Sequence, residues 1–167
     1  RSKMSIPGCD DWLQTPQGKY ILEWEQARFD QMVADIFGFN AVQIGLPQCD
    51  CLRANRMPLR FVYDSSMPAG AIGDAHHLPL AGNSVDLVVL PHVLEFSADP
   101  HQILREVERG RRAAGGVAAA YGEAAAVAMV SVADGEVATS PVRAPRASRI
   151  WSTESNRGSL SSWRSRL

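Results

Sequence analysis

The most regular pattern of hydrophobic and polar positions lies between residues 73 and 109. Within it, residues 85–90 form a short apolar run rich in valine, which is typical of a strand buried in a parallel sheet. Pro91 ends this run. Asp99 and Pro100 are a typical N-cap and first residue of a helix. The apolar residues that follow share one helical face: Ile103, Leu104 and Val107. This part of the chain is therefore predicted to form a strand, a loop and a helix.

The segments before this region predict the rest of an α/β fold. A threonine–proline start, a glycine stop and hydrophobic residues at helical spacing indicate a helix over about residues 17–37. Residues 41–45 and 59–63 are short apolar runs and are predicted to be strands, with a third short strand at 71–73. Residues 1–14 have the pattern of a loop. A sheet of four short strands with flanking helices follows from these patterns.

The composition changes abruptly at Gly110. The segment that starts there is rich in Ala, Arg, Gly, Ser and Val, and it contains no Lys, Phe or His. Residues 117–132 could form a poor strand or helix, and nothing after Ala133 has the pattern of a folded element. We interpret the segment as a low-complexity tail that is either frameshifted or disordered. The predicted organisation is an N-terminal loop and amphipathic helix (1–40), an α/β core (41–109) and this tail (110–167).

Composition and charge exclude few classes of function. The chain of 167 residues has 46% hydrophobic residues and a formal net charge of −1, which are ordinary values for a globular protein. Nucleic-acid binding and membrane binding are not indicated. There is no secretion signal and no long apolar run, so a cytoplasmic protein is expected. The pair Cys49 and Cys51 lacks a second pair at zinc spacing, so no metal site is predicted.

The pieces of residues 73–109 match, in order and spacing, a known pattern. This stretch resembles the class I S-adenosylmethionine-dependent methyltransferases of the methyltransferase type 11 group. The matching pieces are Gly73-Asp74-Ala75, Leu78-Pro79-Leu80, Ser84 to Val89, His92-Val93-Leu94-Glu95, and Leu104 to Arg109. The resemblance implies a Rossmann-like sheet, S-adenosylmethionine as cofactor and an unknown methyl acceptor. Because the pattern is lost at Gly110, we expect a partial sheet that is truncated after the fourth strand.

The N-terminal segment is similar to one uncharacterised proteobacterial subgroup of these proteins. The residues that carry this similarity are Trp12, Thr15 to Gly18, Glu25, Phe37-Gly38 and Gln43-Ile44-Gly45. In active class I enzymes the first strand runs into an acidic residue and a loop with three glycines. Here the aligned residues are Gln43, Gly45, Pro47 and Cys49, so only the first glycine is present. Pro47 also removes a backbone donor. We therefore expect weak cofactor binding.

The same resemblance implies five cofactor-binding residues. Asp74 would accept a hydrogen bond from the adenine amino group, with Ala75 beside it. Asp64 would bind the ribose hydroxyls, although an exposed turn aspartate before Ser65-Ser66 is an equally good interpretation. Gly45 would approach the ligand with its backbone, and His92 would lie near the methionine end. Any binding is expected to depend mainly on Asp74.

No catalytic residue is predicted. Methyl transfer needs little acid–base help, because the sulfonium is already a strong electrophile and the protein mainly aligns the reacting groups. Two other hypotheses remain open. The chain could be a non-catalytic methyltransferase-like remnant that binds no cofactor. A dinucleotide-dependent oxidoreductase is disfavoured, because Gly45 lacks the rest of the glycine fingerprint.

Overall fold

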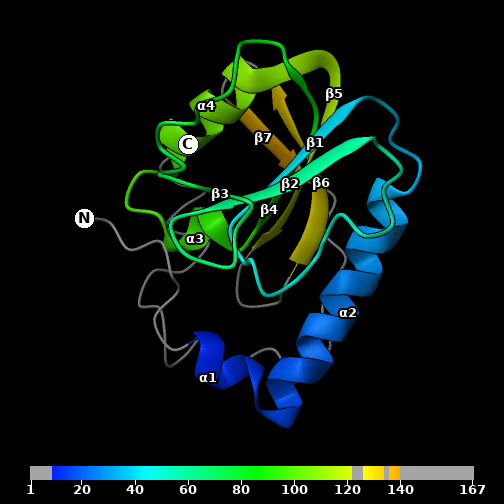
Figure 1. Cartoon of the computed structure of the whole chain (residues 1–167), viewed down its shortest axis with the longest axis vertical. Helices are drawn as coiled ribbons and strands as arrows, with labels where there is room; N and C mark the ends of the chain where they lie inside the picture. The colour runs from blue at the N-terminus through cyan, green and yellow to red at the C-terminus, as the bar shows by residue number, and fades with distance from the viewer. Residues whose placement is uncertain (1–8, 122–125, 134–135, 140–167) are drawn as a thin grey trace.

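The computed structural model describes residues 9–121, 126–133 and 136–139. Within these ranges, seven strands form one sheet in the order β3-β2-β1-β4-β5-β6-β7 (Figure 1). The first five strands pair in parallel, and the last two add antiparallel neighbours at one side. The strands are β1 (Asn40–Ile44), β2 (Leu59–Asp64), β3 (Ala71–Ile72), β4 (Val85–Pro91), β5 (Arg111–Tyr121), β6 (Ala126–Ala133) and β7 (Glu136–Thr139).

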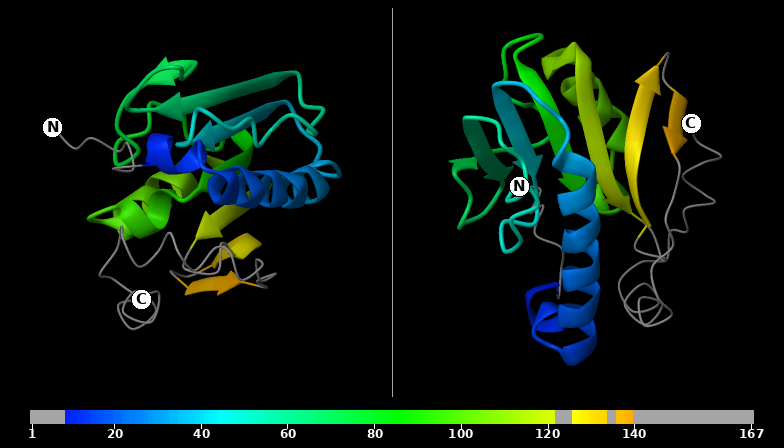
Figure 2. Two further views of the ribbon diagram at one scale, coloured as in Figure 1. Left: turned by 90° about the horizontal axis from the view of Figure 1, so that it is seen from below. Right: turned by 90° about the vertical axis from the view of Figure 1, so that its right-hand side faces the viewer.

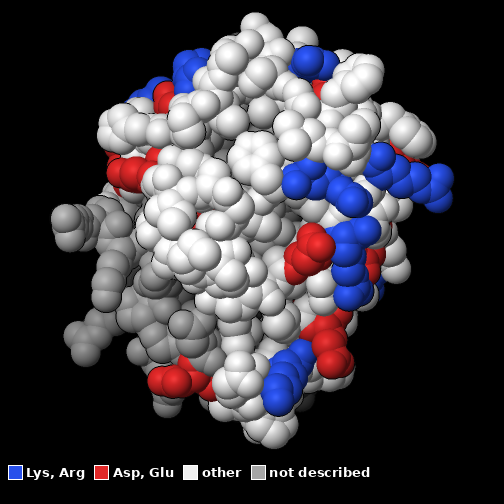
Figure 3. Space-filling model, viewed as in Figure 1, with Lys and Arg blue, Asp and Glu red and all other residues white. Residues whose placement is uncertain are grey.

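The helices that accompany the sheet are α1 (Cys9–Leu13), α2 (Pro16–Val33), α3 (Val93–Phe96) and α4 (Pro100–Gly110). Both predicted N-caps are present. The Thr15 side chain accepts a hydrogen bond from the Gly18 amide, and Asp99 accepts one from the Gln102 amide, each at 3.0 Å. Charged side chains of both signs gather over the outer side of α2 (Figure 3). None of the helices in the described part of the chain is long and apolar enough to cross a membrane.

Helices α2 and α4 cover opposite faces of the sheet (Figure 2). This follows from the alternation of side chains along the strands. On β4, Val88 and Leu90 pack in the cluster that contains Ile103 of α4. Their neighbours Leu87 and Val89 pack in the other cluster, beside Phe29 and Val33 of α2. All seven residues of β4 are buried, as expected for a central strand of a parallel sheet that is covered on both faces.

The predicted α/β fold is confirmed, with two corrections. All four predicted strands and both predicted helices are present within a few residues of their expected bounds. The first correction is α1, which lies in a segment that was predicted to be a loop. The second concerns the predicted end of the sheet and the predicted tail. Strand β5 continues the sheet past the fourth strand and pairs with β4 through residues as far as Pro91 and Ala120. Strands β6 and β7 follow it, and β7 lies beyond Ala133, where no folded element was predicted.

Strand β5 forms although its alanine-rich composition is not typical of a strand. Val117 and the three alanines after it are at most 2% exposed, since they lie between the helices of the two faces. Alanine has a low preference for strands, but burial in a crowded sheet overrides that preference. The α/β core therefore extends beyond residue 109. The proposed frameshift stays a prediction, and residues 140–167 of the predicted tail lie outside the described residues.

Candidate functional site at the carboxyl edge of the sheet

The predicted site residues gather at one edge of the sheet, where the parallel strands β1 to β4 end. From β1 the chain adds β2 and β3 on one side, and β4 and β5 on the other. In open α/β sheets, this change of direction opens a crevice outside the carboxyl ends of the strands, and ligands bind there. The switch point lies between β1 and β4, next to Gly45 and His92. Asp64 and Asp74 follow the neighbouring strands β2 and β3.

Asp64 closes β2 with a buried carboxylate that is only partly satisfied. The residue is 3% exposed. Its Oδ2 atom accepts hydrogen bonds from the Ser66 amide at 3.2 Å and the Ser66 hydroxyl at 2.6 Å. Its Oδ1 atom has no hydrogen-bond partner within the described ranges. Asp64 therefore caps the turn, as the interpretation as a turn aspartate predicts, but it is buried and not exposed.

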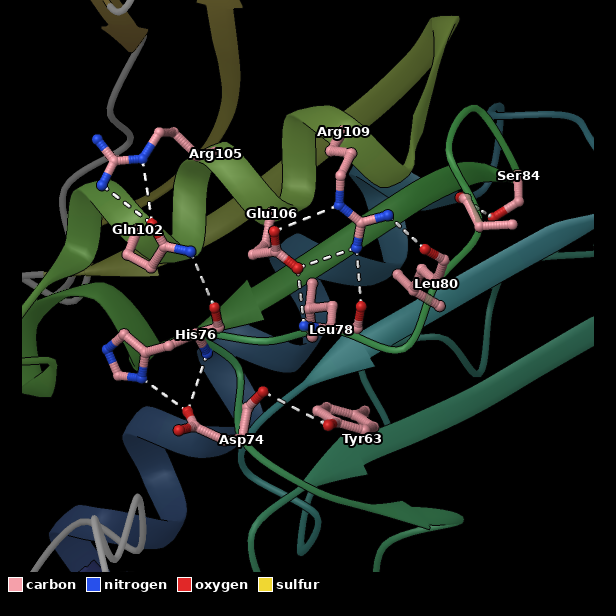
Figure 4. Close-up of polar contacts among 11 residues, drawn as sticks. Tyr63, Asp74, His76, Leu78, Leu80, Ser84, Gln102, Arg105, Glu106 and Arg109 are labelled. Atoms are coloured by element: carbon pink, nitrogen blue, oxygen red, sulfur yellow. Dashed lines mark hydrogen bonds and ion pairs between the residues drawn. The ribbon is translucent and has the colours of Figure 1, made fainter.

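Asp74 lies beside Asp64, directly after the short strand β3. The Gly73 amide donates to the backbone oxygen of Asp64 at 2.9 Å and so extends the pairing of the two strands. The Asp74 carboxylate accepts from the amide of His76 at 2.9 Å, and its Oδ1 atom lies 2.7 Å from Nδ1 of the same histidine (Figure 4). Its side chain is still 47% exposed.

The surroundings of Asp74 keep it ionised. The amide hydrogen bond from His76 is the largest influence and lowers the pKa of Asp74. Partial burial opposes it, and the imidazoles of His76 and His77 lower the pKa further. The other ring nitrogen of His76 lies 2.9 Å from the Ser97 hydroxyl. Asp74 is therefore an ionised acceptor that is held by His76 through Oδ1, while its Oδ2 atom lies 3.7 Å from Nδ1 of the exposed His77.

Helix α4 holds the loop that carries Asp74 (Figure 4). Gln102 donates to the backbone oxygen of His76 at 3.1 Å, and Glu106 accepts from the Leu78 amide at 2.9 Å. Arg109 donates to the backbone oxygen of Leu78 at 2.8 Å and pairs with Glu106 at 2.9 Å. Gln102, Glu106 and Arg109 are spaced four and three residues apart, so they share one face of the helix. The Glu-x-x-Arg spacing therefore has a structural role here, because it ties the loop to the helix.

Gly45 occupies a tight position at the end of β1. Its φ angle of +85° lies in the left-handed region that favours glycine. A Cβ atom at this position would lie 2.6 Å from Cγ2 of Val93, so the backbone of β1 and the start of α3 approach closely here. The Gly45 amide donates to the backbone oxygen of Tyr63 at 2.8 Å. The one glycine that the family pattern retains is thus required by the packing at the switch point.

Gln43 closes the loop that follows Gly45. It is fully buried, and its side-chain nitrogen donates to the backbone oxygens of Leu46 at 3.0 Å and Cys49 at 2.8 Å. Its side-chain oxygen accepts from the Cys51 amide at 2.9 Å. Leu46, Cys49 and Cys51 point into the core on the α2 side. This loop is therefore packed from within by its own side chains, in contrast to the open glycine loop that the resemblance implies.

The two thiols of this loop are close together and buried. Their sulfur atoms lie 3.7 Å apart. The contact with Cys49, followed by burial, raises the pKa of the Cys51 thiol well above its usual value. No group of three or more histidine, cysteine or acidic side chains is placed to hold a metal ion within the described residues. Both cysteines pack in the core cluster on the α2 side.

His92 lies at the end of β4 between two carboxylates. Its Nε2 atom is 2.8 Å from Oε1 of Glu25, and its Nδ1 atom is in close contact with Oε1 of Glu95. Its amide donates to the backbone oxygen of Ala120 at 2.8 Å, and its φ angle is +56°. The histidine and Glu25 are each 4% exposed. These contacts join α2, β4, α3 and β5 at one point.

The charges around His92 determine its protonation. Burial is the largest influence and by itself lowers the pKa of the imidazole. The negative charges of Glu25 and Glu95, together with their hydrogen bonds to the ring, outweigh burial and raise the pKa well above its ordinary value. His92 is therefore a buried imidazolium at neutral pH. The prediction that it contacts a cofactor stays a prediction, and both ring nitrogens already face carboxylate oxygens.

Glu25 is the site residue that sequence reasoning did not assign. It belongs to the buried face of α2, where it takes a position between Ile21 and Phe29 at a spacing of four residues. A charged residue in the middle of an apolar helical stripe is the signal that could have found it, because a charge in that position needs a partner. Its partner, His92, lies 67 residues further along the chain.

Ala75 contributes differently from the other predicted residues. Its side chain is fully buried and packs in the core cluster on the α4 side. Only its backbone could contact a ligand at the edge of the sheet. The structure thus brings Asp64, Asp74 and Ala75 together at the ends of β2 and β3, and Gly45 and His92 together at the ends of β1 and β4.

A parallel sheet covered on both faces, with carboxylates at the carboxyl edge around its switch point, is the architecture of Rossmann-like nucleotide-binding domains. The profile of a family described as "Methyltransferase domain" matches residues 24–119. This match spans more than half of the chain. The chain belongs to this family, the methyltransferase type 11 group of the class I methyltransferases.

Individual proteins are similar to this chain in sequence or in fold. The uncharacterized protein YafS of Escherichia coli K12 is 29% identical over 111 residues, which are 65% of this chain and 46% of YafS. The chain thus spans about half the length of this curated relative. A chain of the Haloferax volcanii complex between the Trm112 methyltransferase activator and a candidate methyltransferase has a TM-score of 0.55 at 22% identity. That match covers 68% of this chain and 58% of the other.

A second solved structure has the same fold. It is a candidate S-adenosyl-L-methionine-dependent methyltransferase from Methanococcus maripaludis, with a TM-score of 0.56 at 16% identity. The match covers 73% of this chain and 66% of the other. At such low identity the likeness establishes the fold alone, and function has to be argued from the site.

Proposed function

We propose that this chain is the cofactor-binding part of an S-adenosylmethionine-dependent methyltransferase whose methyl acceptor is unknown. One observation carries the proposal. Asp64 at the end of β2 has a buried acceptor oxygen that no described residue contacts by a hydrogen bond, and the ionised carboxylate of Asp74 follows the neighbouring strand β3. Ionised carboxylates only accept hydrogen bonds, and both the ribose hydroxyls and the adenine amino group are donors. The chemistry of these two residues therefore fits an adenosine.

The remaining proposed contacts follow from the order of the strands. With adenine at Asp74 and ribose at Asp64, an extended ligand that continues along the edge passes the end of β1 and reaches the end of β4. Gly45, whose amide and carbonyl are both engaged within the fold, would let the ligand pass close to the backbone. Ala75 would contribute its backbone, and His92 would lie near the methionine end. Neighbouring strands are about 4.8 Å apart, so this path from β2 to β4 is about 10 Å long.

In this function the protein orients groups and does not move protons. Bound S-adenosylmethionine supplies an electrophilic methyl group on its sulfonium. The chain's own contribution is to fix the adenosine end through Asp64 and Asp74 and to exclude water at the edge of the sheet. His92 does not act as a base in this account, since both of its ring nitrogens are engaged by carboxylates.

A second candidate function is a non-catalytic methyltransferase-like remnant. The loop after β1 favours it, because Gln43 and the buried side chains of Leu46, Cys49 and Cys51 occupy the space that the resemblance assigns to an open glycine loop. This loop offers a ligand fewer backbone donors. The two candidates differ in whether any adenosyl ligand binds, so one titration separates them.

Isothermal titration of the purified chain with S-adenosylmethionine, S-adenosylhomocysteine and NADH tests the proposal. We expect weak but saturable binding of both adenosyl ligands and no binding of NADH. If none of the three ligands binds to a sample that circular dichroism shows to be folded, the non-catalytic remnant is the better interpretation. Preferential binding of NADH would point to an oxidoreductase.

A further inference from the structure

Glu25, His92 and Glu95 form a cluster of buried charges, which we call the His92 cluster. It contains two carboxylates and one imidazole, each within hydrogen-bonding contact of the next. An imidazole donates to two carboxylates only when both of its nitrogens carry protons. The cluster then has one positive and two negative charges, so its own formal charge is −1. The side chains of Glu25 and His92 are each 5% exposed, and that of Glu95 is 12% exposed.

The His92 cluster stands at the end of β4, on the far side of β1 from Asp64. Strand β1 separates β2 from β4 in the sheet, and Gly45 at its end is in close contact with Val93, the residue after His92. A ligand whose adenosine is held at β2 and β3 would therefore bring its opposite end to the cluster. In S-adenosylmethionine the sulfonium is bonded to the 5′ carbon of the ribose, so along this path it comes directly after the adenosine and before the amino-acid end.

The end of β1 itself has no negative charge. Gln43 stands at the position where the family pattern has an acidic residue, and its neutral amide is used inside the protein to close the loop. Negative charge at the switch point comes instead from Glu25 of α2 and Glu95 of α3. Glu25 reaches this position because it interrupts the apolar face of α2, which otherwise packs on the sheet.

We propose that the Glu25 and Glu95 carboxylates of the His92 cluster determine the preference of this site for the cationic S-adenosylmethionine over the neutral S-adenosylhomocysteine. The inference rests on the proposed function. The two ligands share the adenosine and the amino-acid end, and they differ by one methyl group and one positive charge. A net negative cluster stabilises only the charged ligand. Because the cluster is buried, its field is weakly screened by solvent and salt.

The test is the ratio of the two dissociation constants, measured by isothermal titration on the wild-type chain and on single variants. Glu25→Gln and Glu95→Gln each remove one negative charge and keep an oxygen that accepts from His92. Glu108→Gln is the matched control, because Glu108 lies on α4 and pairs with Arg111. Thermal unfolding of every variant verifies the fold, and the two cluster variants serve independently if one of them is destabilised.

We expect each cluster variant to lower the preference for S-adenosylmethionine by about tenfold, which corresponds to about 1.4 kcal/mol between charges several ångströms apart. Glu108→Gln should leave the preference unchanged. If the cluster variants lose affinity for both ligands equally, the inference is overturned, because the cluster then has a structural role alone. The proposed function would stand in that case. Absence of binding by the wild-type chain would overturn both.

Discussion

The aspartates of this chain have roles that depend on which of their oxygens are engaged. Asp86 at the start of β4 accepts from the amides of Phe39 and Asn40 at 2.8 and 3.0 Å and lies 3.1 Å from Arg112, so it is fully used inside the fold. Asp64 and Asp74 each use one carboxylate oxygen in a local turn, and the second oxygen of Asp74 lies 3.7 Å from Nδ1 of the exposed His77. In the proposed function, the second oxygen of each residue accepts from the ligand. The residue type alone could not distinguish these roles, because hydrogen-bond partners become visible only in the folded chain.

The Asp86 contacts predict a loss of stability without a loss of the site. Asp86→Ala leaves two backbone amides without their acceptor at the start of β1. Unsatisfied buried donors of this kind cost about 1–3 kcal/mol each, and water can recover part of this. We expect the free energy of unfolding, measured by urea denaturation, to fall by about 2 kcal/mol. A variant as stable as wild type would contradict this role of Asp86.

The buried imidazolium predicts a dependence of stability on pH. The pKa of His92 is higher in the folded chain than in the unfolded chain, so the folded state holds its proton more tightly. This contribution is complete below the ordinary histidine pKa of about 6.5 and is lost as the pH rises through the raised value. We therefore expect the free energy of unfolding to decrease as the pH rises above about 6.5.

Glu25→Gln provides the comparison for this pH dependence. The substitution removes one of the charges that raise the pKa of His92, so the decrease should become shallower. Glu108→Gln should keep the wild-type slope. Urea denaturation at a series of pH values measures all three proteins. Identical slopes in the wild-type and Glu25→Gln chains would show that His92 does not titrate as described.

At the scale of elements, the strands and helices were largely predictable and their partners were not. Residues 85–90 and 100–109 carry their periodicity in the local sequence, so both elements were placed correctly. Strand β5 was missed because its buried residues are mainly alanine, and only the crowded space beside β4 makes them suitable for a strand. The Glu25–His92 contact was missed because its two ends are far apart in the sequence and no local pattern links them.

The face of α4 that holds the Asp74 loop predicts an effect of a helix residue on ligand binding. Arg109→Ala removes the ion pair with Glu106 and the donors to the backbone of Leu78, so the loop gains freedom. We expect several-fold weaker binding of S-adenosylhomocysteine, since the ligand must then order the loop. Arg105→Ala on the same helix is the control, since among the described residues the Arg105 guanidinium contacts just the Gln102 side chain. Equal affinities of the two variants would show that the contacts of Arg109 with the Asp74 loop do not affect ligand binding.

At the scale of the whole molecule, the two helical layers leave the carboxyl edge of the sheet as the place where polar side chains converge. Asp64, Asp74, Gly45 and His92 come from four different strand ends and meet only because the strand order is β3-β2-β1-β4. The resemblance to a methyltransferase family indicated these positions, and the topology explains why they lie together. The chain spans about half the length of YafS, and the methyl acceptor is not assigned to any residue of this chain.

The central claim is that this edge binds the adenosine of S-adenosylmethionine through Asp74. Its most direct test is the dissociation constant of S-adenosylhomocysteine for three folded proteins: wild type, Asp74→Ala and Asp35→Ala. Asp35 is an exposed residue between α2 and β1, at the opposite edge of the sheet, and is the matched control. A hydrogen bond to a charged acceptor contributes about 1.5–3 kcal/mol, so Asp74→Ala should weaken binding roughly ten- to hundred-fold while Asp35→Ala leaves it unchanged. Equal affinity of wild type and Asp74→Ala would contradict the account.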